Sequence, residues 1–384
     1  MSSPLHHVAI VGAYNTRQAR AIDVPETELL LDAVRGGLAS SGGLGLGDVD
    51  GVNVSSSVRR LHSREAVMLF GGRPCWTGGD IGIPAVLEAA LAISAGLCEV
   101  ALIATAQALQ YTDRVKTAPW TRPSNEFVEC FGLFTPAEFA LMACRHMHLY
   151  GTQPEALATV AATIRNHGAR HPEAIYHGRF CTPEDVLASR MVADPFHLLD
   201  CATTSEGGAC LVMTTAARAR DLDCQPIYLL GGGTDKQGMA YVTAPVWDRY
   251  GQVGKRAAAQ AFAQAGLTPA DVDVLELYDP FSFEIIRQLE AFGFCDEGEG
   301  GDFVMNGRIA VGGECPVVTN GGLLSFSHAG LAQLLQKPIS AVQQLRGEYP
   351  QALTVEGAQV AITSNGGSGA LFCDVMLLGT EQAA

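Results

Sequence analysis

The fold is indicated by one segment, Leu267-Thr-Pro-Ala-Asp-Val-Asp-Val-Leu-Glu-Leu277. Its pattern resembles that of an earlier segment, Gly47-Asp-Val-Asp-Gly-Val-Asn-Val54. Each segment carries a short acidic turn, and the apolar run that follows each turn is typical of a strand inside a sheet. The two segments lie in opposite halves of a chain of 384 residues. The repeated pattern predicts that one α/β unit occurs twice in the chain.

Strand-like and helix-like segments alternate in the same way around both acidic turns. In the first half we expect strands at His7–Ala13, Asp48–Val54 and Glu99–Thr105, with helices at Glu26–Ala39 and Ile83–Ala95. In the second half we expect strands at Pro226–Gly232, within Leu267–Leu277 and at Gln359–Thr363, with helices at Lys255–Gly266 and Ala329–Leu345. Repeated alternation of this kind predicts a duplicated α/β core.

The segment Tyr111–Asp200, between the two halves, does not follow this alternation. It carries six of the ten histidines and two amphipathic helical patterns, near Pro136–Leu149 and Pro154–His167. An insertion of this length is usually a lid or a binding region. We therefore divide the chain into an N-terminal half (residues 1–110 and 201–225), a loop or lid insertion (111–200) and a C-terminal half (226–384).

Composition excludes several classes of protein. Hydrophobic residues make up 48% of the chain and charged residues 17%, which excludes a disordered or coiled-coil protein. The net charge of −15 makes nucleic acid an unfavourable partner. The longest apolar stretch, Pro84–Ala108, is interrupted by Glu88 and Glu99, so we expect no membrane span.

The cysteines suggest a reduced, cytoplasmic protein. There are 11 of them, an odd number, and none stands in a Cys-x-x-Cys pair. This excludes a disulfide framework and a zinc ribbon. The N-terminal residues show no pattern of a charged and then apolar signal region, so we expect the cytoplasm.

Histidine pairs and glycine runs are the other patterns that could mark a metal or phosphate site. His146 and His148 lie two residues apart, and His167 and His171 lack the intervening Glu of a zincin, so we interpret all four as hydrogen-bonded surface residues. The runs Gly42–Gly47 and Gly231–Gly233 match no phosphate-binding motif. We interpret them as tight turns and expect no metal site.

Three segments of the second half place polar residues just beyond apolar elements. They are Glu276-Leu-Tyr-Asp-Pro-Phe-Ser282, Asn320-Gly-Gly-Leu-Leu-Ser-Phe-Ser-His-Ala-Gly330 and Thr363-Ser-Asn-Gly-Gly-Ser-Gly369. Their glycines allow backbone amides to approach a ligand. Loops that converge at strand ends predict an active site, although ordinary turns would look similar.

Together with Asp200-Cys-Ala-Thr-Thr-Ser-Glu-Gly-Gly-Ala209, these segments resemble the thiolase superfamily. The resemblance covers essentially the whole chain and is strongest to the sterol-carrier and lipid-transfer-protein-like branch. It implies a five-layered αβαβα fold with an inserted loop domain. It also implies a homodimer and an acyl-CoA substrate, with no further cofactor.

The same resemblance locates the family's catalytic positions, and three of the four have changed. Gly79 stands at the position of the nucleophilic Cys, and Thr363 at that of the second Cys. Tyr278 replaces the family's His or Asn, whereas His328 matches its oxyanion-binding His. The resemblance thus predicts Tyr278, Asp279 and His328 as catalytic residues. For substrate and oxyanion binding it indicates the turn and loop residues Gly82, Asn320, Gly321, Gly322, Asn365, Gly366 and Gly367.

A thiolase without its nucleophile cannot form an acyl-enzyme, so we expect a different reaction. A retro-aldol cleavage of a 3-hydroxyacyl-CoA needs no covalent intermediate and suits His328 as an oxyanion donor. Tyr278 would accept or relay the proton, while Asp279 would orient Tyr278 or cap the next helix. This pattern resembles the aldolases that remove side chains from steroid-type CoA thioesters, which work with a zinc-ribbon/OB-fold partner subunit.

Two alternatives to the aldolase remain open from sequence. The chain would be an acyl-CoA thiolase or acyltransferase if a displaced Cys75 served as nucleophile, or a non-catalytic scaffold that binds acyl-CoA. The aromatic and histidine content of the insertion fits a ring-bearing substrate and equally a well-packed lid. From the resemblance to these aldolases we expect a hetero-oligomer built on a central homodimer. The identity of the acyl group stays open.

Overall fold

A computed structural model describes residues 3–56, 65, 75–108, 135–238, 243, 245–367 and 370–382. Nine of its described strands form one sheet in the order β3-β2-β4-β7-β1-β8-β11-β10-β9, and β5 and β6 form a separate two-stranded sheet. In sequence the nine are β1 (Val8–Asn15), β2 (Gly51–Ser56), β3 (Trp76–Thr77), β4 (Val100–Gln107), β7 (Gly207–Thr215), β8 (Ile227–Lys236), β9 (Val274–Glu276), β10 (Val360–Gly367) and β11 (Phe372–Gly379).

The sheet contains the same strand arrangement twice. In the first half β2 runs parallel to β4, and β4, β7 and β1 follow in antiparallel order. In the second half β9 runs parallel to β10, and β10, β11 and β8 follow in antiparallel order. The halves join where Ala9 pairs with Tyr228 and Ile10 with Ile227. The predicted duplication of the core is confirmed.

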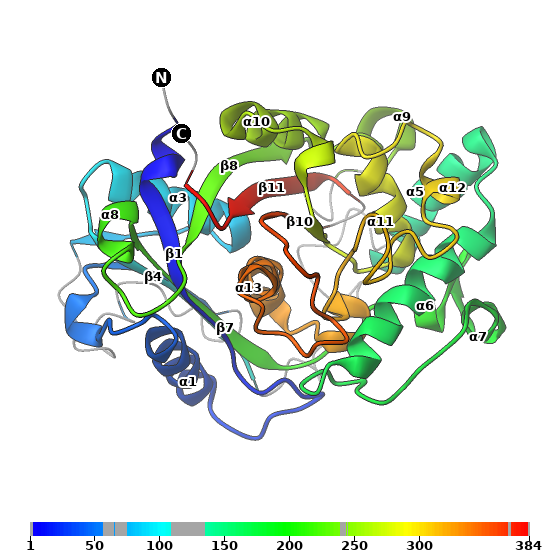
Figure 1. The fold of residues 1–384 in the computed structure, drawn as a ribbon. Helices are drawn as coiled ribbons and strands as arrows, with labels where there is room; N and C mark the ends of the chain where they lie inside the picture. The colour runs from blue at the N-terminus through cyan, green and yellow to red at the C-terminus, as the bar shows by residue number, and fades with distance from the viewer. Residues whose placement is uncertain are drawn as a thin grey trace.

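Four helices complete a five-layered arrangement. The helices α3 (Gly82–Ser94) and α13 (Gln333–Leu345) contact each other and both halves of the sheet. On the outer faces, α1 (Glu26–Ala39) packs on β7, β4 and β1, and α10 (Lys255–Ala265) packs on β8 and β11. Figure 1 shows α13 nearly end-on in the middle, with α1 below and α10 above. The predicted αβαβα order is confirmed.

Further helices lie beside this core. The two expected helices of the insertion are α5 (Thr135–Tyr150) and α6 (Pro154–Arg170), and α6 packs against α11 (Ser282–Ala291). The start of the expected insertion, residues 111–134, lies outside the described residues. The remaining short elements are α7 (Pro183–Ala188), β5 (Met191–Ala193), β6 (Phe196–His197), α8 (Ala216–Ala219), α9 (Trp247–Tyr250) and α12 (Gly300–Phe303).

The run Gly231–Gly233 is not a tight turn, contrary to our expectation, because it lies inside β8. A Cβ atom on Gly231 would stand 2.2 Å from the carbonyl oxygen of Ala261, and one on Gly233 would stand 2.5 Å from that of Ala257. Both carbonyls belong to α10. The glycines therefore allow this helix to pack directly on the strand.

The interpretation of the histidines as surface residues is wrong for three of them, since His146, His167 and His171 are buried. His146 is covered because α11 packs beside its helix and supplies Glu290, whose Oε1 lies 2.9 Å from His146 Nε2. His167 Nδ1 lies 3.1 Å from the carbonyl oxygen of Val318. Within the described ranges, no three or more metal-ligating side chains gather to hold an ion. No helix there is both long and apolar enough to cross a bilayer.

Candidate active site

At the N-terminus of α3 the first half of the chain contacts β10 of the second half. The backbone N–H of Ile83 donates a hydrogen bond of 2.7 Å to Asn365 Oδ1 in β10. Gly82 has a φ of +62°, and a Cβ atom there would stand 2.4 Å from the same oxygen. Two residues predicted for the site, Gly82 and Asn365, are thus brought into contact.

The turn before α3 is open at the position of the family nucleophile. The N–H groups of Gly79 and Asp80 each donate to Glu88 Oε2 at 3.2 Å. A Cβ atom on Gly79 would meet no atom of the described residues within 4 Å. Thr363, at the position of the second Cys, is buried, and its hydroxyl has no hydrogen-bond partner among the described residues. No thiol stands at either position.

Cys75 lies at the wrong end of the sheet to replace the nucleophile. Its N–H donates 2.6 Å to the carbonyl oxygen of Asp50, just before β2, and β2 and β4 run in parallel register from their first residues. Gly330, two residues after His328, contacts Gln107 at the opposite end of β4. The eight residues of β4 span about 20 Å, since a strand rises about 3.3 Å per residue. This geometry argues against the displaced nucleophile.

His328 is held through its backbone, which leaves its imidazole available. Its N–H donates to Ser205 Oγ at 2.8 Å, and the Ser205 N–H donates to the His328 carbonyl oxygen at 3.1 Å. Within the described part of the chain the ring has no hydrogen-bond partner. Although the residue is partly exposed, burial lowers the pKa of His328 to about 4. The imidazole is therefore neutral at pH 7 and carries one N–H donor.

The segment Asp200–Ala209 links His328 to the Tyr-Asp-Pro-Phe motif. Its residue Ala202 donates a backbone hydrogen bond of 2.9 Å to the carbonyl oxygen of Pro280. The Asp200 carboxylate accepts a hydrogen bond of 2.6 Å from Ser282 Oγ at the start of α11. Because Ser205 in the same segment holds His328, three predicted sequence motifs converge here.

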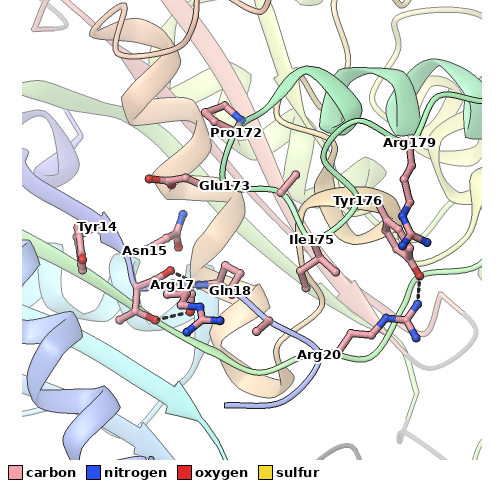
Figure 2. Close-up of a pocket in the computed structure, with 13 residues that line it drawn as sticks. Tyr14, Asn15, Arg17, Gln18, Arg20, Pro172, Glu173, Ile175, Tyr176 and Arg179 are labelled. Carbon is pink, nitrogen blue, oxygen red and sulfur yellow. Dashed lines mark hydrogen bonds between the residues drawn. The ribbon is translucent and has the colours of Figure 1, made fainter. Parts of the chain in front are cut away.

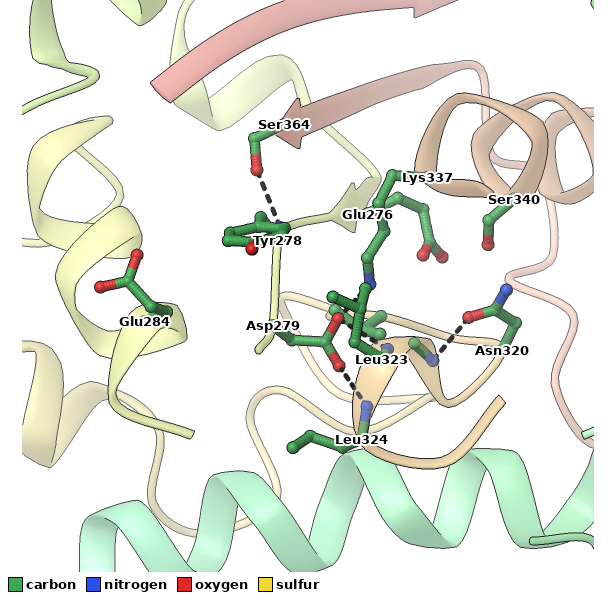
Figure 3. A network of polar contacts seen from close by, with 12 residues as sticks. Glu276, Tyr278, Asp279, Glu284, Asn320, Leu323, Leu324, Lys337, Ser340 and Ser364 are labelled. Carbon is green, nitrogen blue, oxygen red and sulfur yellow. Dashed lines mark hydrogen bonds and ion pairs between the residues drawn. The ribbon is translucent and has the colours of Figure 1, made fainter. Parts of the chain in front are cut away.

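Tyr278 is buried, 6% exposed, beside the end of β10. Its N–H donates to Ser364 Oγ at 2.9 Å, and its carbonyl oxygen accepts from Gln288 Nε2 at 2.7 Å. A Cβ atom on Gly366 would stand 3.0 Å from the tyrosine ring. The ring thus lies directly against the β10 backbone because Gly366 has no side chain; Gly367 is the last residue of this strand. Figure 3 shows Tyr278 and Ser364 on one side of this network.

Asp279 does not cap α11, contrary to one of our two expectations. That helix begins at Ser282 without a side-chain cap. The Asp279 carboxylate instead lies 2.5 Å from Lys337 Nζ and accepts from the N–H groups of Leu323 at 3.0 Å and Leu324 at 3.3 Å (Figure 3). Burial raises the pKa of Asp279, whereas the nearby Lys337 and the two amides lower it. The residue ties α13 to the turn that follows Gly322.

Asn320, Gly321 and Gly322 form a tight turn whose amides are already used. The Gly322 N–H donates to Asn320 Oδ1 at 2.8 Å, and the Gly321 N–H donates to the Val318 carbonyl oxygen at 3.2 Å. Gly321 has a φ of +96°, and a Cβ atom there would stand 2.3 Å from Gly168 Cα. This turn shapes the packing of α6, and neither glycine N–H is left for a substrate oxygen.

Asp374 is a residue at this site that we did not predict from the sequence. It pairs with Asn365 across β10 and β11, and directly opposite residues point to the same face, here the face that meets α3. The side chain is 2% exposed, and its Oδ1 has no hydrogen-bond partner among the described residues. The pKa of Asp374 is raised to about 7, mainly by burial; Lys236 opposes the rise, and Asp80 and Asp235 contribute to it.

Comparison with known proteins shows similarity along the whole chain. Residues 247–380 match the family model "Thiolase C-terminal domain-like". A 17-hydroxy-3-oxo-4-pregnene-20-carboxyl-CoA lyase of Mycobacterium tuberculosis is 34% identical over 366 residues, which cover 88% of this chain and 91% of the lyase. A steroid side-chain-cleaving aldolase of Thermomonospora curvata is 31% identical over 380 residues, covering 92% of this chain and 95% of the aldolase.

A solved structure described as an Ltp2-ChsH2(DUF35) aldolase is similar to the fold found here. It aligns with a TM-score of 0.87 and 28% sequence identity, and the alignment covers 100% of both chains. The two halves and the intervening segment therefore all have counterparts in that protein.

Proposed function

This chain belongs to the thiolase superfamily, in the group that contains steroid side-chain-cleaving aldolases, and from that premise we propose that it cleaves a 3-hydroxyacyl-CoA by a retro-aldol reaction. The observation that carries the proposal is the turn before α3. Gly79 occupies the nucleophile position there, with no atom of the described residues within 4 Å of its Cβ position, and both of the cysteine positions of ordinary thiolases lack a thiol. A reaction without an acyl-enzyme fits this turn.

The proposed reaction balances with two proton transfers. A base takes the proton of the 3-hydroxyl group, a carbonyl forms at that carbon, and the bond between Cα and Cβ breaks. Its electron pair collects on the thioester as an enolate, whose carbon then takes up a proton. The products are a ketone or an aldehyde and a shortened acyl-CoA. No step requires a metal or an organic cofactor beyond the CoA thioester itself.

We assign the base to Asp374. The carboxylate lies on the sheet face that meets α3, beside Asn365, and its Oδ1 is free of hydrogen bonds among the described residues. A pKa of about 7 suits a general base that must be deprotonated near neutral pH and still bind a proton. The sequence alone had left the identity of this base open.

His328 and Tyr278 take the other two roles. The neutral His328 imidazole donates its N–H to the thioester oxygen as negative charge develops, a role in which one donor contributes about 3 kcal/mol. Tyr278 supplies the proton to the enolate carbon, because its phenolic hydroxyl is a proton donor. Asp279 stabilises the surrounding turn through Lys337 and does not enter the chemistry.

Substrate and partners follow by similarity to the relatives. Their names specify steroid side chains and a pregnene-carboxyl-CoA, so we propose a bulky, ring-bearing acyl group for this chain as well. The name Ltp2-ChsH2(DUF35) describes two components. We propose that this chain likewise forms a homodimer that binds a zinc-ribbon/OB-fold partner subunit, in the cytoplasm.

An assay for carbon–carbon cleavage tests this proposal. The chain, with and without its partner subunit, is incubated with ring-bearing 3-hydroxyacyl-CoA thioesters, and released ketone or aldehyde is measured by liquid chromatography and mass spectrometry. We expect release that is unchanged in Cys75→Ser and falls at least 100-fold in Tyr278→Phe, the range of acid–base catalysis. Tyr150→Phe, outside the site, serves as the control. Full activity of Tyr278→Phe would remove that residue from the mechanism, and binding without any cleavage would favour the scaffold.

A further inference from the structure

His328 is held through its backbone, and a single serine binds both of its backbone groups. The His328 N–H donates to Ser205 Oγ at 2.8 Å, and the His328 carbonyl oxygen accepts from the Ser205 N–H at 3.1 Å. The imidazole has no hydrogen-bond partner of its own within the described part of the chain. The place of the ring therefore depends on the contacts of Ser205.

Two further side chains continue the hydrogen bonding from Ser205 away from the imidazole. Ser205 Oγ lies 2.9 Å from Ser327 Oγ, and Ser327 Oγ donates to Gln18 Oε1 at 2.7 Å. Because Gln18 Oε1 can only accept, the Ser327 proton is committed to it, and Ser205 must donate to Ser327. This serine relay (Ser205, Ser327 and Gln18) thus has one direction, from the His328 N–H to Gln18.

Gln18 is the fixed end of the serine relay. Its Oε1 also accepts from Gln336 Nε2 in α13 at 2.9 Å, and its Nε2 donates to the Thr16 carbonyl oxygen at 2.7 Å. A Cβ atom on Gly207 would stand 2.0 Å from Gln18 Oε1, so the amide lies directly against the start of β7. Figure 2 shows Gln18 on the segment that follows β1, where it lines a cavity of about 940 Å³. Three separate segments therefore fix this amide.

The serine relay is excluded from solvent. Ser205 and Ser327 are 0% exposed, and Gln18 and Gln336 are 7% and 2% exposed. A buried polar group that loses its partner costs more free energy than the hydrogen bond itself contributes. Consecutive hydrogen bonds in a low-dielectric interior also strengthen one another. Loss of any one hydroxyl therefore disturbs the whole relay and, through it, the backbone of His328.

We propose that Ser205, Ser327 and Gln18 are positioning residues that hold the His328 imidazole where it meets the substrate oxygen. The reaction that this placement serves rests on the proposed function, whereas the placement of the ring does not. Moving a catalytic group by about 1 Å costs about 10²-fold in rate. The relay acts through His328, so its loss lowers kcat and leaves KM unchanged.

Single and double substitutions test whether these residues act as one relay. In Ser205→Ala, Ser327→Ala and Gln18→Met we expect kcat to fall about tenfold or more with KM unchanged, because an interaction made in the transition state is weakened. The double variant Ser205→Ala/Ser327→Ala should lose no more than the larger single loss, since either substitution already breaks the relay. Losses that multiply in the double variant would contradict a relay. Ser327→Thr, which keeps the hydroxyl, should recover most of the kcat.

Ser41→Ala is the matched control for the loss of a buried hydroxyl. Ser41 is also 0% exposed, and its hydroxyl donates to the Leu38 carbonyl oxygen at 2.6 Å, at the end of α1. Thermal unfolding of every variant measures the loss of stability, and kcat is compared at a temperature where all of them are folded. We expect the parent kcat in Ser41→Ala. A fall in kcat as large as in Ser327→Ala would show that the effect is general destabilisation and would overturn the positioning role.

Nuclear magnetic resonance of the imidazole separates this inference from the proposed reaction, because it requires no turnover. The ring signals of His328 in the chain with isotope-labelled histidine are assigned by their loss in His328→Gln. We expect these signals to shift in Ser205→Ala and Ser327→Ala and to stay unchanged in Ser41→Ala, which supports the relay even if the chain cleaves no hydroxyacyl-CoA. Unchanged ring signals overturn the inference. Unchanged kcat in all variants of an active aldolase also overturns it, while the proposed function stands.

Discussion

Burial shifts the pKa values of two side chains at the candidate active site in opposite directions, and each shift suits a different role in the reaction. Burial lowers the pKa of His328 to about 4, so this imidazole remains a neutral donor across the physiological range. Burial raises the pKa of Asp374 to about 7, so this carboxyl group exchanges a proton there. At the residue scale, the chemistry therefore depends on Asp374 being deprotonated while His328 is neutral.

The pH profile of the reaction tests the role of Asp374. Because the active base is the carboxylate, we expect kcat/KM to rise with pH and to level off above about pH 7. Asp374→Asn should lower kcat by about 10²- to 10⁴-fold and remove this rise. Asp296→Asn serves as the control, because that carboxylate is exposed and is not among the groups that shift the pKa of Asp374. If kcat/KM of Asp374→Asn still rises with pH as it does in the parent chain, Asp374 is excluded as the base.

Asp279 has a structural role that can be separated from catalysis. Asp279→Asn leaves Lys337 buried without its counter-ion, and we expect a loss of about 3–5 kcal/mol in the free energy of unfolding. Urea denaturation followed by circular dichroism measures this loss, with the exposed Asp296→Asn as control. The fraction that remains folded should keep its kcat. A stable but inactive Asp279→Asn variant would contradict the structural role.

At the scale of elements, the most sensitive junction is the N-terminus of α3. In Gly82→Ala, a methyl group would meet Asn365 Oδ1 in addition to the strain of a φ of +62°. Gly96→Ala is a matched control, because Gly96 has a φ of +71° and no atom of the part of the chain that the structure describes lies within 4 Å of its Cβ position.

We expect Gly96→Ala to cost about 1–2 kcal/mol of stability from backbone strain alone. Gly82→Ala should cost about 1–3 kcal/mol more through overpacking, and its kcat should fall because Asn365 moves away from α3. Thermal unfolding and steady-state kinetics of both variants measure the difference. Equal stability and equal kcat in the two variants would show that the contact between Gly82 and Asn365 is unimportant.

The sequence predicted most elements of the core, and α1 begins and ends at the expected residues. The helices were predictable because their apolar residues repeat at helical spacing. Strands β7 and β11 were not assigned; in β11, Asp374 interrupts the apolar run, and the strand lies between the adjacent β10 and the distant β8. The functional interest of Asp374 appears only when Asn365 and α3 are seen beside it.

At the site itself, the motif residues were predictable but their partners were not. The sequence placed Tyr278, Asp279 and His328 on loops of the C-terminal half, and no pattern pointed to Lys337 as the partner of Asp279. That pair joins a loop to a helix that begins more than fifty residues later in the chain. Long-range pairings of this kind follow from packing and not from local propensity.

The whole molecule is strongly acidic. A measurement in solution tests its proposed assembly into a homodimer that binds a partner subunit. We expect light scattering to show the chain at about twice its mass of 40.4 kDa, and a larger complex when the partner subunit is added. A DUF35-type partner that fails to associate at any ionic strength, or a chain that remains monomeric, would contradict the proposed assembly.

The proposed reaction breaks a carbon–carbon bond in a thiolase-superfamily chain that has no thiol at either cysteine position of ordinary thiolases. Intact-protein mass spectrometry during turnover of a 3-hydroxyacyl-CoA, combined with product analysis, distinguishes this reaction from thiolysis. We predict that ketone or aldehyde and shortened acyl-CoA form in equal amounts, without added CoA and without any acyl group on the protein. An acylated cysteine, or cleavage that requires free CoA, would contradict the account.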